Sequence, residues 1–197
     1  MFIKICGMTS ESAIVAAVEC GVDAIGFVFA QSPRQLTPQQ AAMLSAAAPP
    51  ELVRVAVTHH PDQELVDEIC RWLDPDWLQT DFEDLADLDI PTDMQTLPVL
   101  RAGGLTPAEI PPRLLFEGPV SGRGVVSDWS GAENLSRNAE LILAGGLNAT
   151  NIRAAITRVR PFGVDVSSGV ESAPGVKDAR RMAEFVTAVR GMEAGTS

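Results

Sequence analysis

Two late segments of the sequence combine glycine and serine in a way that suits phosphate binding. AGGLNATN contains Gly145 and Gly146, and VSSGV contains Ser167 and Ser168. Glycine lets backbone N–H groups approach an anion closely, and a short helix that follows adds its positive end. One Gly-Gly pair alone is equally consistent with an ordinary turn. Two such segments, each directly after a short apolar run, predict a phosphate site.

Side chains that can carry charge or move protons also stand at the ends of short apolar runs. Cys6 ends the first run, Arg34 lies in the loop after the second, and Arg101 and Glu117 end two later runs. If these runs are parallel strands of one barrel, their carboxyl ends meet on one face, where barrel enzymes carry their active sites. The sequence therefore places a thiol, a carboxylate and two guanidinium groups near the predicted phosphate site.

The composition argues against several classes of protein. The chain of 197 residues has 15 Lys and Arg against 26 Asp and Glu, a net charge of −11 that does not suit nucleic-acid binding. No apolar run is long enough to cross a membrane, and residues 1–6 resemble a strand rather than a secretory signal. Cys6, Cys20 and Cys70 form no CxxC pair, so we expect a cytoplasmic protein without disulfides or a metal centre.

Short apolar runs alternate with amphipathic segments along most of the chain. Thr9 or Ser10 and Thr37 suit helix caps, Pro38 suits a first helical turn, and Gly21 suits a helix end. The predicted strands are Phe2–Cys6, Asp23–Phe29, Val53–Thr58, Trp77–Thr80, Leu97–Arg101, Arg113–Glu117, Glu140–Leu143 and Phe162–Val166. The predicted helices are Ser10–Cys20, Pro38–Ala48, Pro61–Trp72, a brief acidic Phe82–Leu88, one that ends near Val159, and Lys177–Arg190.

Strands that are each followed by a helix or a short substitute predict an α/β fold, a compact single-domain (β/α)₈ TIM barrel. We expect it to occupy residues 1–192, with 193–197 as a disordered tail. Barrels usually need about 200 residues or more. This chain fits because Thr106–Pro112 leaves room for barely one turn of a shortened fifth helix. The alternative is an open doubly wound sheet, but no GxGxxG motif follows the first strand.

Several longer motifs, taken together, resemble the phosphoribosylanthranilate isomerase family. KICGMT opens the chain, GFVF precedes SPR, SGRG precedes DWS, and LAGGLN precedes VDVSSGVE and PGVKD. The matches run from Lys4 to Asp178 in the family's order and spacing, whereas the middle, roughly Thr58 to Leu97, matches poorly. The resemblance implies a barrel enzyme of tryptophan biosynthesis. Its substrate would be N-(5′-phosphoribosyl)anthranilate and its product 1-(o-carboxyphenylamino)-1-deoxyribulose 5-phosphate.

The family's reaction is an Amadori rearrangement, an aldose–ketose isomerisation classed with the intramolecular oxidoreductases. A general acid protonates the ribose ring oxygen, the ring opens to an imine, and a general base then removes the proton at C2′. The resemblance therefore implies one acid and one base on opposite sides of the sugar, and no cofactor. Catalysis by each such group contributes about 10²- to 10⁴-fold to the rate.

The resemblance implies that Cys6 is the general base. An ordinary thiol is mostly protonated at neutral pH, so a neighbouring cation should help it to lose its proton. Lys4 lies two residues earlier on the same strand and therefore points to the same face. Lys4 can also pair with Asp165 on the strand that closes the barrel, and both interactions can hold. We expect Asp165 among the substrate-binding residues.

The general acid departs from the family's pattern. The family usually has an aspartate at the end of the sixth strand, in a run such as LLD, whereas this sequence reads LLFEGP. Glu117, one residue later, is the preferred candidate, and the neighbouring Leu115 and Phe116 would partly desolvate it. Asp128, in SDWS, is the alternative. The SGRG segment is a candidate lid over the sugar.

The remaining predicted contacts also follow from the resemblance. Arg34 aligns with the arginine that holds the anthranilate carboxylate, and its planar fork suits such a grip. Arg101 stands where the family usually has a strand-end lysine, so we expect it to add positive charge near the substrate. WLQTD replaces the family's QLHG, so the histidine of the fourth strand is missing. Because adjacent side chains point opposite ways on an extended chain, we expect His59 and His60 to be loop residues without a shared metal site.

Two other functions remain open at this stage. The related phosphosugar isomerase of histidine biosynthesis performs the same rearrangement on a doubly phosphorylated substrate, but it is longer and uses two aspartates. A non-catalytic phosphate-binding barrel that acts as a partner or regulator is supported only by the missing strand-six aspartate. For the isomerase, we expect a small-molecule phosphosugar as the partner, no nucleic acid or membrane, and a monomer or homodimer.

Overall fold

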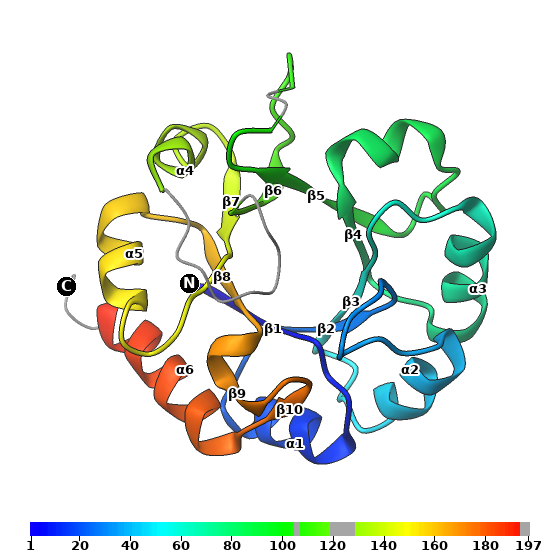
Figure 1. The fold of residues 1–197 in the computed structure, drawn as a ribbon, viewed down its shortest axis with the longest axis horizontal. Coiled ribbons are helices and arrows are strands. Elements are labelled where there is room, and N and C mark those ends of the chain that lie inside the picture. The colour runs from blue at the N-terminus through cyan, green and yellow to red at the C-terminus, as the bar shows by residue number, and fades with distance from the viewer. Residues whose placement is uncertain (105–106, 119–128, 194–197) are drawn as a thin grey trace.

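The computed structural model describes residues 1–104, 107–118 and 129–193, and these contain one closed barrel. Its parallel strands lie side by side in chain order, and β8 pairs with β1 (Figure 1). The strands are β1 Phe2–Cys6, β2 Ala24–Val28, β3 Val53–Val57, β4 Trp77–Asp81, β5 Gln95–Arg101, β6 Arg113–Glu117, β7 Glu140–Leu143 and β8 Gly163–Val166. The predicted TIM barrel is therefore confirmed, and the open sheet is wrong because the β1–β8 pairing closes the ring.

Helices cover most of the outside of the barrel (Figure 1). They are α1 Glu11–Glu19, α2 Pro38–Ser45, α3 Gln63–Leu73, α4 Ser130–Leu135, α5 Ile152–Val159 and α6 Ala179–Glu193. The side chain of Ser10 caps α1, Thr37 and Gln40 form a reciprocal capping box on α2, and Asp62 caps α3. Among the described helices, none is long and apolar enough to cross a membrane.

The outer cover of the barrel is thin between β4 and β6. Only a 3₁₀ helix, η1 Phe82–Asp87, follows β4. The described residues 102–104 and 107–112, between β5 and β6, contain no helix at all. The shortened fifth helix predicted there is therefore absent from the described part of that segment. Partly buried side chains of loops, including Leu88, Ile90 and Ile110, pack against the core instead.

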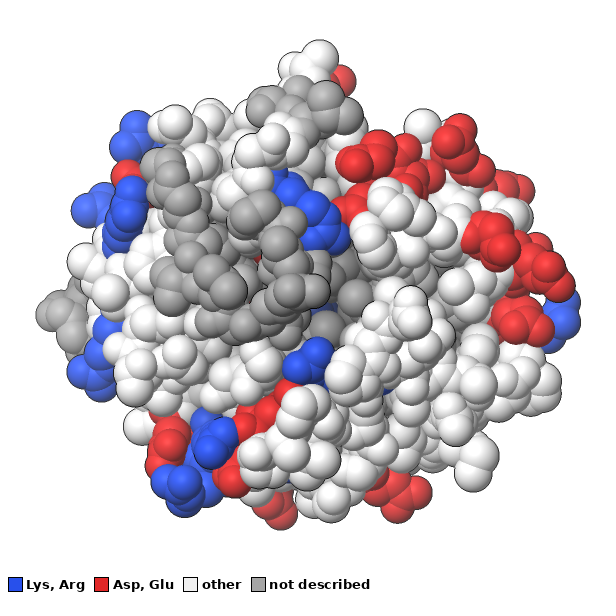
Figure 2. Space-filling view, viewed as in Figure 1, with Lys and Arg blue, Asp and Glu red and all other residues white. Residues whose placement is uncertain are grey.

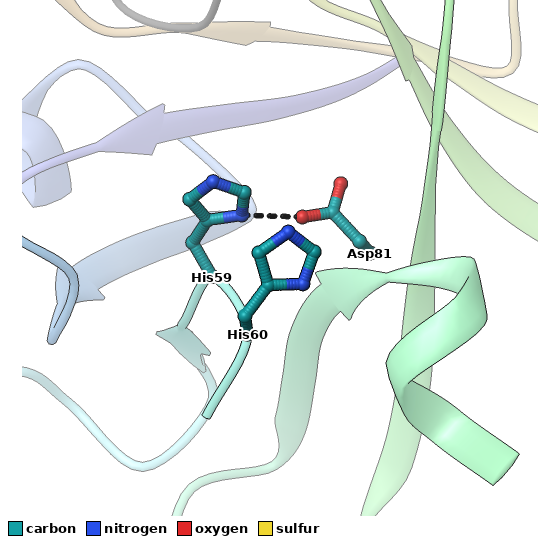
Figure 3. A group of neighbouring side chains, drawn as sticks. All are labelled: His59, His60 and Asp81. Carbon is teal, nitrogen blue, oxygen red and sulfur yellow. Dashed lines mark hydrogen bonds and ion pairs between the residues drawn. The ribbon is translucent and has the colours of Figure 1, made fainter. Parts of the chain in front are cut away.

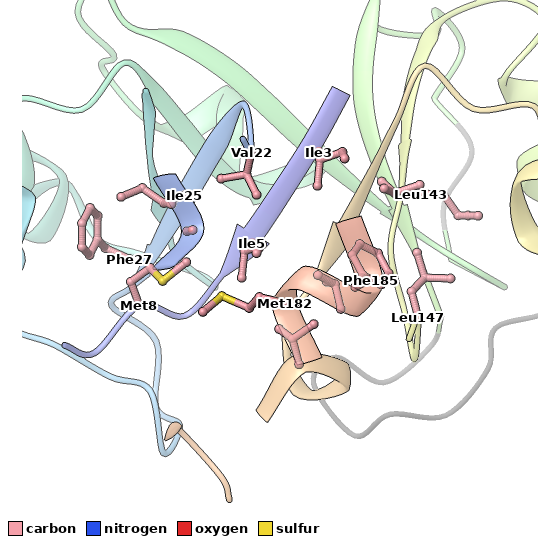
Figure 4. Close-up of a cluster of buried hydrophobic side chains, with 14 of the residues drawn as sticks. Ile3, Ile5, Met8, Val22, Ile25, Phe27, Leu143, Leu147, Met182 and Phe185 are labelled. Carbon is pink, nitrogen blue, oxygen red and sulfur yellow. The ribbon is translucent and has the colours of Figure 1, made fainter. Parts of the chain in front are cut away.

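Two apolar layers hold the barrel together. In the outer layer, Ile3 and Ile5 of β1 are fully buried together with Met182 and Phe185 of α6 (Figure 4). Full burial of one such side chain stabilises the fold by about 1.5–3 kcal/mol. The inner layer fills the barrel itself with Ala24, Val55, Trp77, Leu97, Val99, Leu115, Ile142 and Ala144. Lys4 pairs in register with Ala24 and is fully buried, so this interior also contains an ammonium group.

A short hairpin between β8 and α6 is not anticipated by the sequence analysis. It follows the 3₁₀ helix η2 Ser168–Val170 and consists of β9 Glu171–Ala173 and β10 Val176–Lys177, which pair antiparallel. Gly175, with φ 80°, forms the turn between them. Lys177, predicted at the start of the last helix, is therefore in a strand. Helix α6 begins at Ala179 and runs to Glu193, the first residue of the predicted tail.

Candidate functional site

A cavity of about 800 Å³ opens at the carboxyl ends of the barrel strands. Basic side chains border the centre of the barrel, whereas acidic ones gather over α3 and η1 (Figure 2). Every site residue predicted from the sequence lines this cavity: Cys6, Arg34, Arg101, Glu117, Gly145, Gly146, Asp165, Ser167 and Ser168. Residues from opposite sides of the barrel thus face one space of the size that binds small molecules.

Cys6 and Lys4 share the space beside Gly26 of β2. The ammonium of Lys4 donates to Asp165 Oδ1 over 2.9 Å, which is the predicted ion pair. A Cβ on Gly26 would lie 3.1 Å from Cys6 Sγ and 3.3 Å from Lys4 Nζ, so the missing side chain makes room for both groups. Lys4 therefore pairs with Asp165 and also lies near the Cys6 thiol, so both interactions predicted for it are present.

Burial raises the pKa of the Cys6 thiol, and the positive charge of Lys4 lowers it only in part. The carboxylate of Asp165 acts in the raising direction, whereas Lys177 and Arg34 act in the lowering direction. The sequence predicted that nearby cations lower the pKa of the thiol. The cations are present, but the effect of desolvation on this pKa is larger than theirs. The neutral thiol therefore predominates at neutral pH, and the surrounding cations limit how strongly it holds its proton.

The two Gly/Ser segments form neighbouring loops after β7 and β8. Gly145 and Gly146 have φ values of 91° and 67°, in the region that favours glycine. A Cβ on Gly169 would lie 2.0 Å from the carbonyl oxygen of Leu147, so the two loops touch at this point. Ser167 Oγ donates to the carbonyl of Cys6 over 3.0 Å and ties the second loop to β1. The loops are thus placed side by side, as an anion site between them requires.

Arg34 is held by partners that the sequence analysis did not identify. Its Nε and Nη2 donate to the two carboxylate oxygens of Glu171 over 2.6 and 2.7 Å. Lys177 donates to Glu171 Oε1 over 2.8 Å and to the carbonyl of Ser167 over 3.1 Å. Burial opposes the charge on Glu171, but the hydrogen bonds from Arg34 and Lys177 outweigh it and lower its pKa to about 2. The three side chains together carry one net positive charge beside the cavity.

Arg101 joins two carboxylates at the ends of neighbouring strands. Its Nε donates to Asp81 Oδ1 over 2.8 Å, and its Nη1 donates to Glu117 Oε1. The side chain of Glu117 is 12% exposed, which agrees with the partial desolvation predicted for it. In the proposed role of general acid, Glu117 must be released from this contact with Arg101 when it carries its proton. The alternative acid, Asp128, and the SGRG segment lie outside the described residues.

His59 and His60 lie in the loop after β3, as predicted, but the prediction that their side chains point opposite ways is wrong. Their ring centroids lie 4.1 Å apart beside Asp81 (Figure 3). His59 Nδ1 lies 2.6 Å from Asp81 Oδ2, and both histidines line the cavity. His60 has φ 48°, in the left-handed region, and this breaks the alternation of an extended chain on which the prediction rested.

Comparison with known proteins points to one family. Residues 3–188 match the family described as N-(5′-phosphoribosyl)anthranilate (PRA) isomerase. A curated N-(5′-phosphoribosyl)anthranilate isomerase of Brucella canis is 37% identical, and the match covers 95% of this chain and 93% of that protein. The crystal structure of phosphoribosyl anthranilate isomerase from Thermus thermophilus has a TM-score of 0.85 at 26% identity, covering 98% of this chain and 100% of that one. A phosphoribosyl anthranilate isomerase in complex with reduced 1-(o-carboxyphenylamino)-1-deoxyribulose 5-phosphate is 28% identical with a TM-score of 0.77, covering 97% and 99% of the two chains.

Proposed function

The chain belongs to the N-(5′-phosphoribosyl)anthranilate isomerase family, and from this membership we propose how its own residues divide the reaction among them. It is an isomerase of tryptophan biosynthesis that converts phosphoribosylanthranilate into the carboxyphenylamino-deoxyribulose phosphate by an aldose–ketose rearrangement. Family membership favours this activity over the histidine-pathway isomerase and over a non-catalytic barrel. We assign Cys6 as the general base and Glu117 as the general acid, with no cofactor.

The base assignment rests on the position of Cys6 at the end of β1, where its thiol and the buried ammonium of Lys4 share the space beside Gly26. The thiolate takes the proton from C2′ of the imine and returns to the neutral thiol. Because desolvation raises the pKa of this thiol, the proton it has accepted is well held. The ion pair between Lys4 and Asp165 keeps one positive charge beneath the sulfur throughout the cycle.

The acid assignment requires a proton on Glu117 when the sugar ring opens. In the structure, Glu117 and Asp81 share the guanidinium of Arg101. The proposal therefore has Arg101 turn toward Asp81 when the substrate enters, so that Glu117 takes up a proton from solvent water and presents it to the ring oxygen. Glu117 stands on β6 and Cys6 on β1, far apart around the ring of strands, as a reaction on both sides of a sugar requires.

We assign the two ends of the substrate to two parts of the cavity, the Gly/Ser loops and Arg34. The phosphate would bind between Gly145–Gly146 and Ser167–Ser168, because both loops line the cavity and glycine lets backbone N–H groups approach an anion. The anthranilate carboxylate would bind Arg34 through Nη1, because Nε and Nη2 are taken by Glu171. Lys177 offsets the charge of Glu171, so the site stays attractive to an anion in a protein of net charge −11.

The observation that carries the proposal is one cavity that brings Cys6, Glu117, Arg34 and both Gly/Ser loops together. The test is a fluorescence assay that follows the loss of phosphoribosylanthranilate with the purified chain. The doubly phosphorylated substrate of the histidine-pathway isomerase serves as the matched second substrate. We expect turnover of the first substrate, and a chain that turned over only the second would contradict the assignment.

We further propose that the enzyme works in the cytoplasm as a monomer or homodimer, and that a small phosphosugar is its only required partner. Three free cysteines support a reducing compartment. The net charge of −11 argues against nucleic acid as a partner. Light scattering behind a sizing column would distinguish the monomer and the dimer from any larger assembly.

A further inference from the structure

Two side chains that line the cavity, those of His59 and His60, have no part in the proposed reaction, and they lie beside Asp81, the partner of Arg101. His59 and His60 follow β3, and Asp81 is the last residue of the neighbouring β4 (Figure 3). Each of the three residues offers one ligand atom, and these atoms all lie within 4.8 Å of one another. Two imidazoles and one carboxylate from adjacent strand ends form the type of ligand set that binds divalent transition metals in proteins.

The backbone at His60 brings the two rings together. A left-handed φ of 48° is uncommon for residues other than glycine, although histidine adopts it more often than most. It turns both rings to the same side of the chain, so that both lie beside Asp81 (Figure 3). The backbone N–H of His60 donates to Asp84 Oδ2 over 3.1 Å, which holds this turn in place.

A second, independent observation is the hydrogen bond behind His60. Its Nδ1 lies 2.7 Å from Asp84 Oδ1, and Asp84 is itself held by the hydroxyl of Thr80 at 2.8 Å. The other ring nitrogen of His60 points toward Asp81 and His59 (Figure 3). Histidines that bind metals usually donate their second N–H to a carboxylate in this way, because the bond fixes the tautomer and the ring orientation. Asp84 thus holds the ring of His60 in the orientation that a metal ligand needs.

We propose that His59, His60 and Asp81 bind one divalent transition-metal ion of the zinc, nickel or cobalt class. The ion would replace the proton shared by His59 Nδ1 and Asp81 Oδ2, which now lie 2.6 Å apart. Around a tetrahedral ion with ligand bonds of 2.0–2.2 Å, these atoms must separate to about 3.4 Å. The rings of His59 and His60 are 53% and 59% exposed, so they can make this small movement while the buried Asp81 stays in place.

The local charge also favours a cation at this place. Asp81 is 3% exposed and already accepts from Arg101, so one of its oxygens is neutralised and the other faces the histidines. Glu83 also lines the cavity, and acidic side chains gather over the nearby η1 and α3 (Figure 2). Three protein ligands leave at least one coordination position for water or a ligand from the cavity.

The test is isothermal titration of the full-length chain with NiCl₂, in a Cys20→Ser/Cys70→Ser background that removes two thiols able to compete for the metal. His59→Gln, His60→Gln and Asp81→Asn are compared with Asp87→Asn, which changes an exposed carboxylate on the same 3₁₀ helix as Asp84. We expect one ion per chain, a Kd raised at least about tenfold in the first three variants, and an unchanged Kd in the control. Asp84→Asn should weaken binding by about 10- to 100-fold, as loss of a carboxylate behind a ligand does.

Three results would overturn the proposal: no binding of nickel, equal affinity in both histidine variants and the parent chain, or equal affinity for Mg²⁺. The last would indicate only a cluster of negative charge, since Mg²⁺ prefers oxygen ligands. The absorption spectrum of the Co²⁺ form gives a separate readout. Ligation by nitrogen and oxygen predicts no thiolate charge-transfer band, whereas such a band would place the metal on Cys6 and reject this site.

Discussion

At Cys6, burial and neighbouring charge act in opposite directions on one proton, and the proposed mechanism depends on that proton moving. Cys6→Ala should lower kcat by about 10²- to 10⁴-fold, the usual worth of a general base. The fold should survive because the side chain is small. Cys20→Ala, at the end of α1 and away from the cavity, is the control and should keep full activity. Activity of Cys6→Ala within about threefold of the parent would rule out Cys6 as the base.

The pH dependence of kcat/KM should report the same proton. Because desolvation raises the pKa of the thiol, kcat/KM should rise with pH as the thiolate fraction grows. Lys4→Met removes a charge that lowers this pKa, so the rise should move to higher pH. Asp165→Asn removes a charge that raises it, so the rise should move to lower pH. Both variants break the same ion pair, and shifts in the same direction would show that electrostatics at the thiol are not the cause.

Glu117 and Asp128 compete for the role of acid, and matched amide variants distinguish them. Glu117→Gln should lower kcat by about 10²- to 10⁴-fold, and Asp128→Asn should have a much smaller effect. Steady-state rates with both variants, after far-UV circular dichroism has shown that each is folded, decide the matter. Loss of activity in Asp128→Asn alone would transfer the role to that residue. Full activity in both would mean that the proton comes from another group.

Among single residues, those at strand ends were predictable and their partners were not. Cys6, Arg101 and Glu117 each end a recognisable apolar run, and the barrel brings such ends to one cavity. The contacts of Glu171 and Lys177 were not predicted, because the hairpin that carries them is too short to show a periodic sequence pattern. The error at His60 has a similar origin, since a single left-handed residue reverses the expected direction of a side chain.

At the scale of elements, Gly169 fixes the spacing of the two loops to which we assign the phosphate. Gly169→Ala would place a Cβ 2.0 Å from the carbonyl oxygen of Leu147, so the loops must move apart. Overpacking of this kind usually costs about 1–3 kcal/mol of stability, and KM should rise because the N–H groups around the phosphate separate. Gly191→Ala in α6, whose Cβ would meet nothing closer than 3.5 Å, should be neutral or slightly stabilising. Equal melting temperatures and KM values for the two variants would contradict this account.

Helix starts were predictable because caps are local. Ser10 and Thr37 begin α1 and α2 as the sequence indicated. Helix ends were less predictable, and α2 stops at Ser45 although the apolar run continues to Ala48. Pro49 and Pro50 follow directly, and because a residue before proline disfavours the helical conformation, the helix ends before the apolar run does. The described residues between β5 and β6 form no helix, and the local sequence did not predict this absence.

At the scale of the whole molecule, the ion pair of Arg34 and Glu171 joins the loop after β2 to strand β9, and the two residues are 137 positions apart in the chain. The pKa of Glu171 is about 2, below its ordinary value of 4.5, so the pair stabilises the fold fully above about pH 4.5 and less as pH falls toward 2. A shift of this size corresponds to about 3 kcal/mol.

Urea unfolding of the parent and of Glu171→Gln over this range checks the expectation. The difference in unfolding free energy between them should shrink as the pH is lowered. Glu184→Gln, which changes an exposed carboxylate on α6, is the control and should show almost no difference at any pH. A gap between the parent and Glu171→Gln that stays constant down to about pH 3 would show that the charge of Glu171 does not stabilise the fold.

The thin cover between β4 and β6 gives the two halves of the barrel unequal rigidity. Strand β1, which carries Cys6, is packed under α6 through Ile3 and Ile5, whereas the described residues between β4 and β6 in the chain contain no α-helix. Segments with few buried contacts open locally at a lower free energy than the rest of a domain. Backbone amides near Arg101 and Glu117 should therefore exchange with solvent deuterium before those near Cys6. With Cys6 as the proposed base and Glu117 as the proposed acid, local opening of β5 and β6 would separate the two groups by moving the acid.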